Sequence, residues 1–176
     1  MKRPLSLAAL GTLCLASTAL AQAPAADALR SVAKSASTNL VAAAEEMPAD
    51  KYGFKPTPAQ MSFGDVIGHL SGGNDFLCSH ISGVEAPKRA ELAKTAAKSE
   101  RVARLKETFQ FCESSLAKLD DSKLGEKVPF FGHTEVSRAE AMFAAAEDWS
   151  DHYSQLAIYL RLNGLLPPTA KNKQAE

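Results

Sequence analysis

The stretch Ser137–Gly164 reads SRAEAMFAAAEDWSDHYSQLAIYLRLNG, and it decides the fold of this chain. Ser137 followed three residues later by Glu140 is a capping box, in which each side chain accepts a hydrogen bond from the other residue's backbone amide. Gly164 is the residue type that most often closes a helix. Positions three and four residues apart between these signals form one face suited to a core. They are Met142, Ala145, Trp149, His152, Leu156, Tyr159 and Asn163. The stretch predicts one long amphipathic helix.

Three further helices are predicted before this one. We expect them from about Asp27 to Met47, from Ser62 to Gly83 and from about Ser99 to Leu119. Each repeats apolar residues at intervals of three and four, which is typical of a helix with one face in a core. The repeating positions are Leu29, Val32, Ala36, Leu40, Ala43 and Met47; then Val66, Leu70, Leu77 and Ile81; then Val102, Leu105, Phe109, Cys112, Leu116 and Leu119.

The connections between these helices carry few strand signals. Prolines between Pro48 and Pro58 forbid helix there, so we expect an ordered loop anchored by Tyr52 and Phe54. A short extended piece is predicted near Val128–Phe131. Four amphipathic helices with so little else predict an all-α protein, a four-helix bundle.

The N-terminus has the order of a secretory signal peptide. Lys2 and Arg3 precede an apolar run from Leu5 to Leu20, and Ala19-Leu-Ala21 provides a small-residue cleavage site. The apolar run is too short and too rich in alanine for a convincing membrane span, so we expect no membrane anchor. Residues 1–21 are therefore predicted to be removed on export, and the mature protein to be periplasmic or secreted.

The remaining chain is enough for one domain. We expect a single bundle over residues 22–168 and a disordered polar tail over residues 169–176. The full chain has 20 basic and 20 acidic side chains, with 45% hydrophobic residues. That balance is ordinary for a globular protein and argues against a nucleic-acid-binding protein, which needs a basic face to neutralise phosphates. The sequence leaves open whether the protein forms a homodimer.

Two cysteines remain after removal of the leader, which contains Cys14. Cys78 and Cys112 lie on or beside inward faces of the second and third helices. Two inert buried thiols are one interpretation, and a disulfide is the other. We expect the two residues to be close and, after export, to form the disulfide.

Polar residues interrupt the apolar faces at three places. His152 occupies a core position of the last helix, Asp148 lies one turn before it, and His69 lies at the inner edge of the second helix. Three inward nitrogen and oxygen ligands from two facing helices would suit a divalent metal ion. The alternatives without metal are a hydrogen-bonded core histidine and an Asp–His ion pair. His80 is too far along its helix to join, and His133 is expected in a loop.

Two segments resemble the DinB/YfiT-like family of metal-binding four-helix proteins, and particularly its exported members. They are Met61–Leu70, MSFGDVIGHL, and Asp148–Pro168, DWSDHYSQLAIYLRLNGLLPP. The resemblance implies three histidine ligands around a divalent ion, at positions that here hold His69, Asp148 and His152. Asp148 departs from the pattern. An aspartate at this position leaves two interpretations open, a His/Asp/His site for zinc or nickel and a site that has lost its metal.

What the resemblance implies about activity is a metal-dependent hydrolase or transferase that acts on a small molecule whose identity the sequence does not give. Some relatives use a low-molecular-weight thiol, which is less available to an exported protein. The alternative is a non-enzymatic bundle that binds a metal or a ligand without turnover. The chain contains no glycine-rich phosphate loop, no G-x-S-x-G elbow and no C-x-x-C pair.

Overall fold

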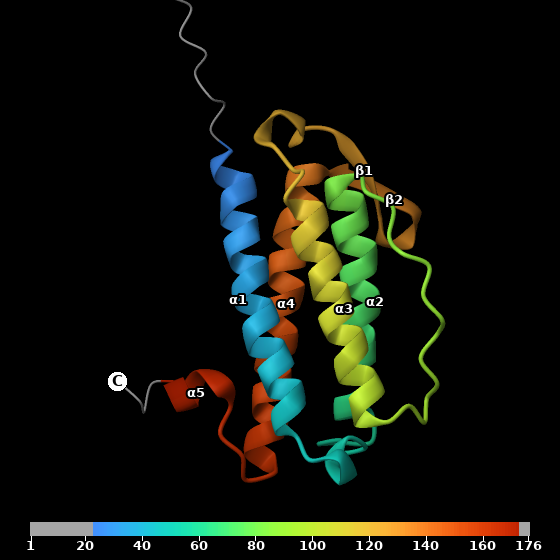
Figure 1. Cartoon of the computed structure of the whole chain (residues 1–176), viewed down its shortest axis with the longest axis vertical. Helices are drawn as coiled ribbons and strands as arrows, with labels where there is room; N and C mark the ends of the chain where they lie inside the picture. The colour runs from blue at the N-terminus through green and yellow to red at the C-terminus, as the bar shows by residue number, and fades with distance from the viewer. Residues whose placement is uncertain (1–22, 173–176) are drawn as a thin grey trace, which may run out of the picture.

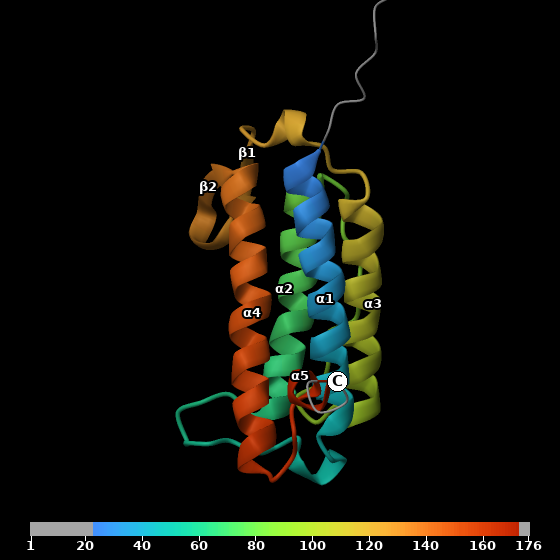
Figure 2. The same ribbon diagram turned by 90° about the vertical axis from the view of Figure 1, so that its left-hand side faces the viewer.

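The computed structural model describes residues 23–172, in which four long helices run side by side (Figures 1 and 2). The elements in chain order are α1 (Pro24–Glu46), α2 (Phe63–Ser82), α3 (Lys98–Leu116), β1 (Lys127–Phe130), β2 (Thr134–Ser137), α4 (Arg138–Leu162) and α5 (Pro168–Asn172). Single turns of 3₁₀ helix occur at Ala49–Lys51, Asp121–Lys123 and Phe131–His133. The prediction of an all-α four-helix bundle is confirmed.

Each long helix packs against two others. α2 contacts α3 and α4, and α1 contacts the same two, so α2 and α4 are neighbours in the bundle. The connection of residues 84–97 runs back along the outside of the bundle, and α2 and α3 therefore point the same way (Figure 1). α4 runs opposite to α2. This arrangement places the middle of α2 against the middle of α4.

The helix ends follow from local sequence where the cap is local. The Ser62 hydroxyl accepts a hydrogen bond from the Asp65 amide at 3.1 Å, and α2 closes at Gly83, whose φ is +75°. In the predicted capping box, the Glu140 amide donates to Ser137 Oγ at 3.2 Å and the Ser137 amide donates to Glu140 Oε2 at 2.6 Å. The caps of α2 and α4 are therefore confirmed.

α1 begins three residues before the predicted start because its cap comes from another part of the chain. The amides of Ala25 and Ala26 each donate to the Asp121 carboxylate at 2.9 Å. Within α1, Val32 was expected in the core and is 39% exposed, while Ala33 is buried in its place. The prediction for Val32 is wrong because the buried face of α1 passes from Leu29 to Ala33, an interval of four residues, before it continues at Leu40.

The loop before α2 is ordered as predicted. Tyr52 is buried and its hydroxyl donates to the Ala44 carbonyl at 2.6 Å. Phe54 meets the edge of Tyr159 with ring centroids 5.9 Å apart. These contacts fix the chain at the end of the bundle where α2 begins.

The extended piece near Val128 is one strand of a hairpin. β1 pairs with β2 in antiparallel register, with Val128 opposite Val136. The partner strand was not predicted, because its four residues carry only one apolar side chain. Within residues 23–172 this hairpin is the only sheet.

The polar tail differs from the prediction in part. Residues Pro168–Asn172 form α5, in which the Thr169 amide donates to the Tyr153 hydroxyl at 3.0 Å. Residues 173–176 lie outside the described residues, as does the predicted leader of residues 1–21. None of the helices in the described part of the chain has both the length and the apolar run that crossing a membrane requires.

A disulfide joins α2 to α3. Cys78 and Cys112 are both fully buried, their Cα atoms are 5.2 Å apart, and 34 positions separate them in the sequence. The prediction that the two cysteines are close and bonded is confirmed. A disulfide is compatible with export.

Candidate metal centre

The three predicted residues meet where the middle of α2 faces α4. One ligand atom each of His69, Asp148 and His152 can be chosen so that all lie within 4.8 Å of one another. The two imidazole rings are 5.0 Å apart between centroids. His152 is buried, Asp148 is half-buried and His69 is exposed, so the group extends from the core to the surface. His69 was predicted at the inner edge of its helix, and it lies at the outer edge.

A backbone contact fixes which nitrogen of His152 carries a proton. His152 Nδ1 lies 2.7 Å from the carbonyl oxygen of Asp148 and 3.3 Å from Asp148 Oδ1. A carbonyl oxygen only accepts, so Nδ1 must be the donor. The neutral ring then has its lone pair on Nε2. Histidines that bind metals are commonly held in this way by a second acceptor.

Asp148 has one oxygen without a partner. Within the described residues, Oδ2 is buried and makes no hydrogen bond. Burial raises the pKa of the Asp148 carboxyl, and the nearby imidazoles of His152 and His69 partly oppose that rise. A cation beside Oδ2 would remove the unfavourable burial of the ionised carboxylate. The donor set therefore fits a divalent ion.

Gly73 lies beside this carboxylate. A Cβ atom placed on Gly73 would lie 3.7 Å from Asp148 Oδ2, which is an ordinary van der Waals distance. Close packing between α2 and α4 therefore does not require a glycine at either position of the Gly72-Gly73 pair.

A buried polar network beside the group was not predicted. Trp149 Nε1 donates to Asn74 Oδ1 at 2.7 Å, and Asn74 Nδ2 donates to Thr108 Oγ1 at 3.1 Å. Asn74 follows Gly73 in the chain, and Trp149 follows Asp148. The network thus joins α4, α2 and α3 at the level of the candidate ligands. Its sequence signal was an asparagine four residues after Leu70 and three before Leu77, on the apolar face of α2.

His80 lies outside the group, as the sequence indicated. His80 Nδ1 lies 2.7 Å from the Phe76 carbonyl oxygen, and its ring packs against that of Phe76 with centroids 4.3 Å apart. Of the groups of histidine, cysteine and acidic residues in the described part of the chain, only the His69, Asp148 and His152 group has metal-site spacing.

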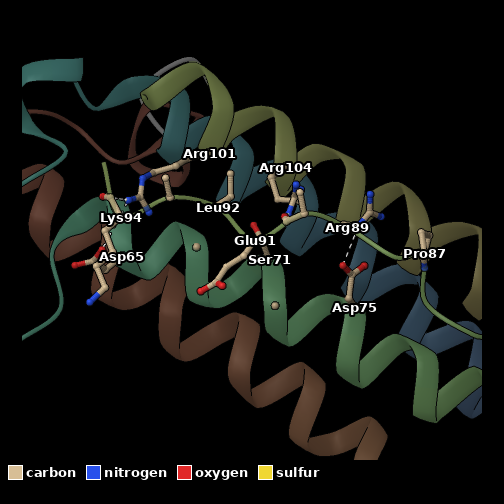
Figure 3. A pocket seen from close by; sticks show the side chains of 14 residues that line it. Asp65, Ser71, Asp75, Pro87, Arg89, Glu91, Leu92, Lys94, Arg101 and Arg104 are labelled. Atoms are coloured by element: carbon tan, nitrogen blue, oxygen red, sulfur yellow. Dashed lines mark hydrogen bonds and ion pairs between the residues drawn. The ribbon is translucent and has the colours of Figure 1, made fainter. Parts of the chain in front are cut away.

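Two hollows lie near α2 and α4. One of about 510 Å³ adjoins the candidate centre. Its lining residues are Ala144, Glu147, Asp148, Ser150, Asp151 and Ser154. The other, of about 450 Å³, lies between α2, α3 and the connection of residues 84–97 (Figure 3).

Several of the charged side chains that line the second hollow have partners, although Asp75 Oδ1 is buried without a hydrogen bond within the described residues. Arg89 Nε donates to Asp75 at 2.8 Å, the pair joined by the dashed line in Figure 3. The buried Arg101 donates to the carbonyl oxygens of Gly64 and Lys94, each at 2.7 Å. These bonds fasten the connection of residues 84–97 to α2 and α3.

The fold and this site define a class, a four-helix bundle with a convergent His/Asp/His group between its second and fourth helices. The family model described as the DinB superfamily matches residues 34–156, and the chain belongs to this family. No curated protein matches it in sequence.

Solved structures show the same fold at low sequence identity. A DinB-like protein from Bacillus subtilis is 19% identical with a TM-score of 0.63, covering 78% of this chain and 92% of its own. One from Bacillus cereus is 12% identical with a TM-score of 0.67, covering 81% and 95%. A mutant of the mycothiol-dependent maleylpyruvate isomerase is 12% identical with a TM-score of 0.53, covering 74% and 60%.

Proposed function

We propose that His69, Asp148 and His152 hold one divalent transition-metal ion, zinc or nickel, and that the protein is a metal-dependent hydrolase or transferase for a small molecule. The observation that carries this proposal is the convergence of one ligand atom each of His69, Asp148 and His152 within 4.8 Å of one another. Within the described residues, the buried Oδ2 of Asp148 has no hydrogen-bond partner. Nitrogen and carboxylate ligands suit both ions.

His152 and His69 would have different roles at such a site. His152 is oriented by the Asp148 carbonyl, which keeps Nδ1 protonated and Nε2 available. His69 is exposed and faces solvent, so it stands on the side from which a substrate arrives. When bound, an ion with three protein ligands keeps a position open and acts as a Lewis acid that lowers the pKa of water.

The alternative is a non-enzymatic bundle that binds a metal or ligand without turnover. A structural neighbour named as a mycothiol-dependent isomerase supports an enzymatic reading of the fold. We also propose that residues 1–21 are an export signal, that the mature protein is periplasmic or secreted, and that residues 22–168 form its single domain. The Cys78–Cys112 disulfide supports export.

The test is the metal content of protein purified without chelators, followed by titration with zinc, nickel, manganese and iron. We expect about one ion per chain and an affinity that falls as the pH is lowered, because protons compete for the ligand atoms. His69→Ala should weaken binding about 100-fold or more without unfolding the bundle, since His69 is exposed.

His80→Ala is the matched control. It removes a histidine from the same helix, outside the group, and should leave metal affinity unchanged. Failure to take up any of the four metals at micromolar concentration would overturn the proposal. Stoichiometric metal without turnover in ester-hydrolysis and thiol-transfer screens would favour the non-enzymatic alternative.

A further inference from the structure

The Cys78–Cys112 disulfide lies next to a hydrogen bond that also joins α2 to α3. Asn74 Nδ2 donates this bond to Thr108 Oγ1 at 3.1 Å, and both links connect residues 34 positions apart. Asn74 precedes Cys78 by four residues, as Thr108 precedes Cys112, and α2 and α3 point the same way (Figure 1). The two links therefore lie one helical turn apart on the facing sides of these helices.

The polar link extends to α4, and its donors and acceptors allow one arrangement. Thr108 Oγ1 donates its single proton to the Leu105 carbonyl oxygen at 3.0 Å, so it accepts from the Asn74 amide group. Asn74 Oδ1 therefore faces Trp149 Nε1, which can only donate and lies 2.7 Å away. A reversed Asn74 amide would lose both bonds, so this side chain fixes α2, α3 and α4 at one level.

The same level contains the carboxylate of the candidate centre. Trp149 directly follows Asp148 in α4, and Asn74 directly follows Gly73 in α2. Gly73 is the α2 residue whose added Cβ would lie 3.7 Å from Asp148 Oδ2. The bond between Trp149 and Asn74 therefore sets where Asp148 lies relative to α2.

The disulfide and the polar link are in direct contact in the interior. Cys112 Sγ lies 3.5 Å from the Asn74 carbonyl oxygen. Cys78, Cys112, Asn74 and Thr108 are all fully buried, so water does not replace a lost partner. Without the covalent bond, the two sulfur atoms must separate to van der Waals contact, and a close-packed interior transmits that displacement. Asn74 receives it directly.

We infer that the Cys78–Cys112 disulfide is a positioning element of the metal centre, which holds Asn74 and, through Trp149, the carboxylate of Asp148 in the arrangement that binds the ion. This inference rests on the proposed function. A cross-link that acted only by restricting the unfolded chain would change stability and leave the metal affinity of the folded protein unchanged. A positioning element changes that affinity, commonly by about 10- to 100-fold for groups that orient metal ligands.

The test is a titration of folded protein with cobalt against a competing chelator, with the visible absorption of bound cobalt as the readout. The Cys78→Ala, Cys112→Ala double variant should bind cobalt about tenfold more weakly than the disulfide-bonded protein. Circular dichroism establishes the folded fraction of each sample, and affinities are compared for the folded fraction only.

Reduced protein provides a second route to the same state. A phosphine gives the disulfide two electrons, the two sulfurs take up two protons, and the phosphine becomes its oxide with an oxygen from water. After removal of the phosphine and under exclusion of oxygen, the reduced protein should show the same loss of cobalt affinity. This measurement keeps the test decisive where the alanine variant is unfolded.

Two further variants separate positioning from stability. Leu29→Ala is the matched control, because it removes a buried side chain of α1, lowers stability by an amount comparable to loss of the disulfide, and should leave cobalt affinity unchanged. Asn74→Leu tests the route. In that background, removal of the disulfide should change cobalt affinity by less than about twofold, because the two changes act through one contact.

Three results would overturn this inference alone. They are equal cobalt affinities with and without the disulfide, an equal loss of affinity in Leu29→Ala, and an undiminished effect of the disulfide in the Asn74→Leu background. A disulfide-bonded protein that takes up no cobalt would overturn the proposed function as well.

Discussion

The α2–α4 interface and the α1–α3 interface bury different kinds of polar group. Between α1 and α3, polar groups act at the helix ends through long side chains. Arg30 donates to the Leu116 and Leu119 carbonyl oxygens at 2.9 and 3.0 Å, and Lys98 donates to the Met47 carbonyl oxygen at 2.7 Å. These bonds satisfy carbonyl groups that a helix end leaves free.

Between α2 and α4, Arg138 likewise donates to the His80 and Ile81 carbonyl oxygens at the end of α2. A second set of polar groups lies in mid-helix, where the backbone needs no partners. His152, Asp148 and Asn74 are short side chains in the interior or at its edge, and Asp148 Oδ2 has no partner within the described residues. Polar groups at helix ends serve the fold. Polar groups in mid-helix, gathered from two helices and incompletely paired, indicate a site.

The largest effect should come from breaking the link between the two interfaces. The Cys78–Cys112 disulfide joins α2 to α3, and the chain-entropy estimate for closing 34 residues is about 4 kcal/mol. We expect the Cys78→Ala, Cys112→Ala double variant to lose about that much free energy of unfolding in urea titrations. Reductant should destabilise the unsubstituted protein and leave the double variant unchanged.

The next effect should come from the middle of the α2–α4 interface. Asn74→Leu removes the acceptor of Trp149 Nε1 and the donor to Thr108, which leaves buried groups unpaired and costs about 2–3 kcal/mol. Because Asn74 lies beside Gly73, we also expect metal affinity to fall at least about tenfold as the helices shift. Urea unfolding and metal titration measure the two effects separately.

Arg30→Met is the control at the α1–α3 interface. It removes two hydrogen bonds at a helix end and should lower stability without changing metal affinity, because within the described residues the hydrogen bonds of Arg30 go to α1 and to the end of α3 and not to α2 or α4. If Arg30→Met weakens metal binding as strongly as Asn74→Leu, polar groups at helix ends and in mid-helix do not have separate roles.

The sequence predicted what depends on local periodicity and local caps. The helix faces follow from repeated apolar residues, and the ends at Ser62, Gly83 and Ser137 follow from residue types that satisfy free backbone groups. The convergence of His69 with α4 was predictable because an apolar face interrupted by a histidine and an aspartate one turn apart is unusual.

What the sequence did not predict depends on partners distant in the chain. The early start of α1 requires Asp121, 95 or more positions away, and the role of Asn74 requires Trp149, 75 positions away. Neither pairing leaves a pattern in the local sequence. The short helix α5 likewise depends on the hydroxyl of Tyr153, which accepts a hydrogen bond from the Thr169 amide.

The smallest effects on the free energy of unfolding should come from two carboxylates, Asp65 on α2 and Asp148 on α4. In metal-free protein, we expect their removal to have effects of opposite sign. The Ser62 hydrogen bonds lower the pKa of Asp65, so its contribution to stability is present above its unfolded pKa and is lost as pH falls. Burial raises the pKa of Asp148, so its contribution is favourable at low pH and is lost as pH rises through the folded value.

At pH 7, Asp65→Asn should therefore destabilise the bundle and Asp148→Asn should stabilise it, each by less than about 1 kcal/mol because both groups are partly solvated. Both differences should shrink below about pH 4. Urea unfolding from pH 3 to 7 with a chelator measures them. A stabilising effect that persists at low pH would show that the charge of Asp148 is not its cause.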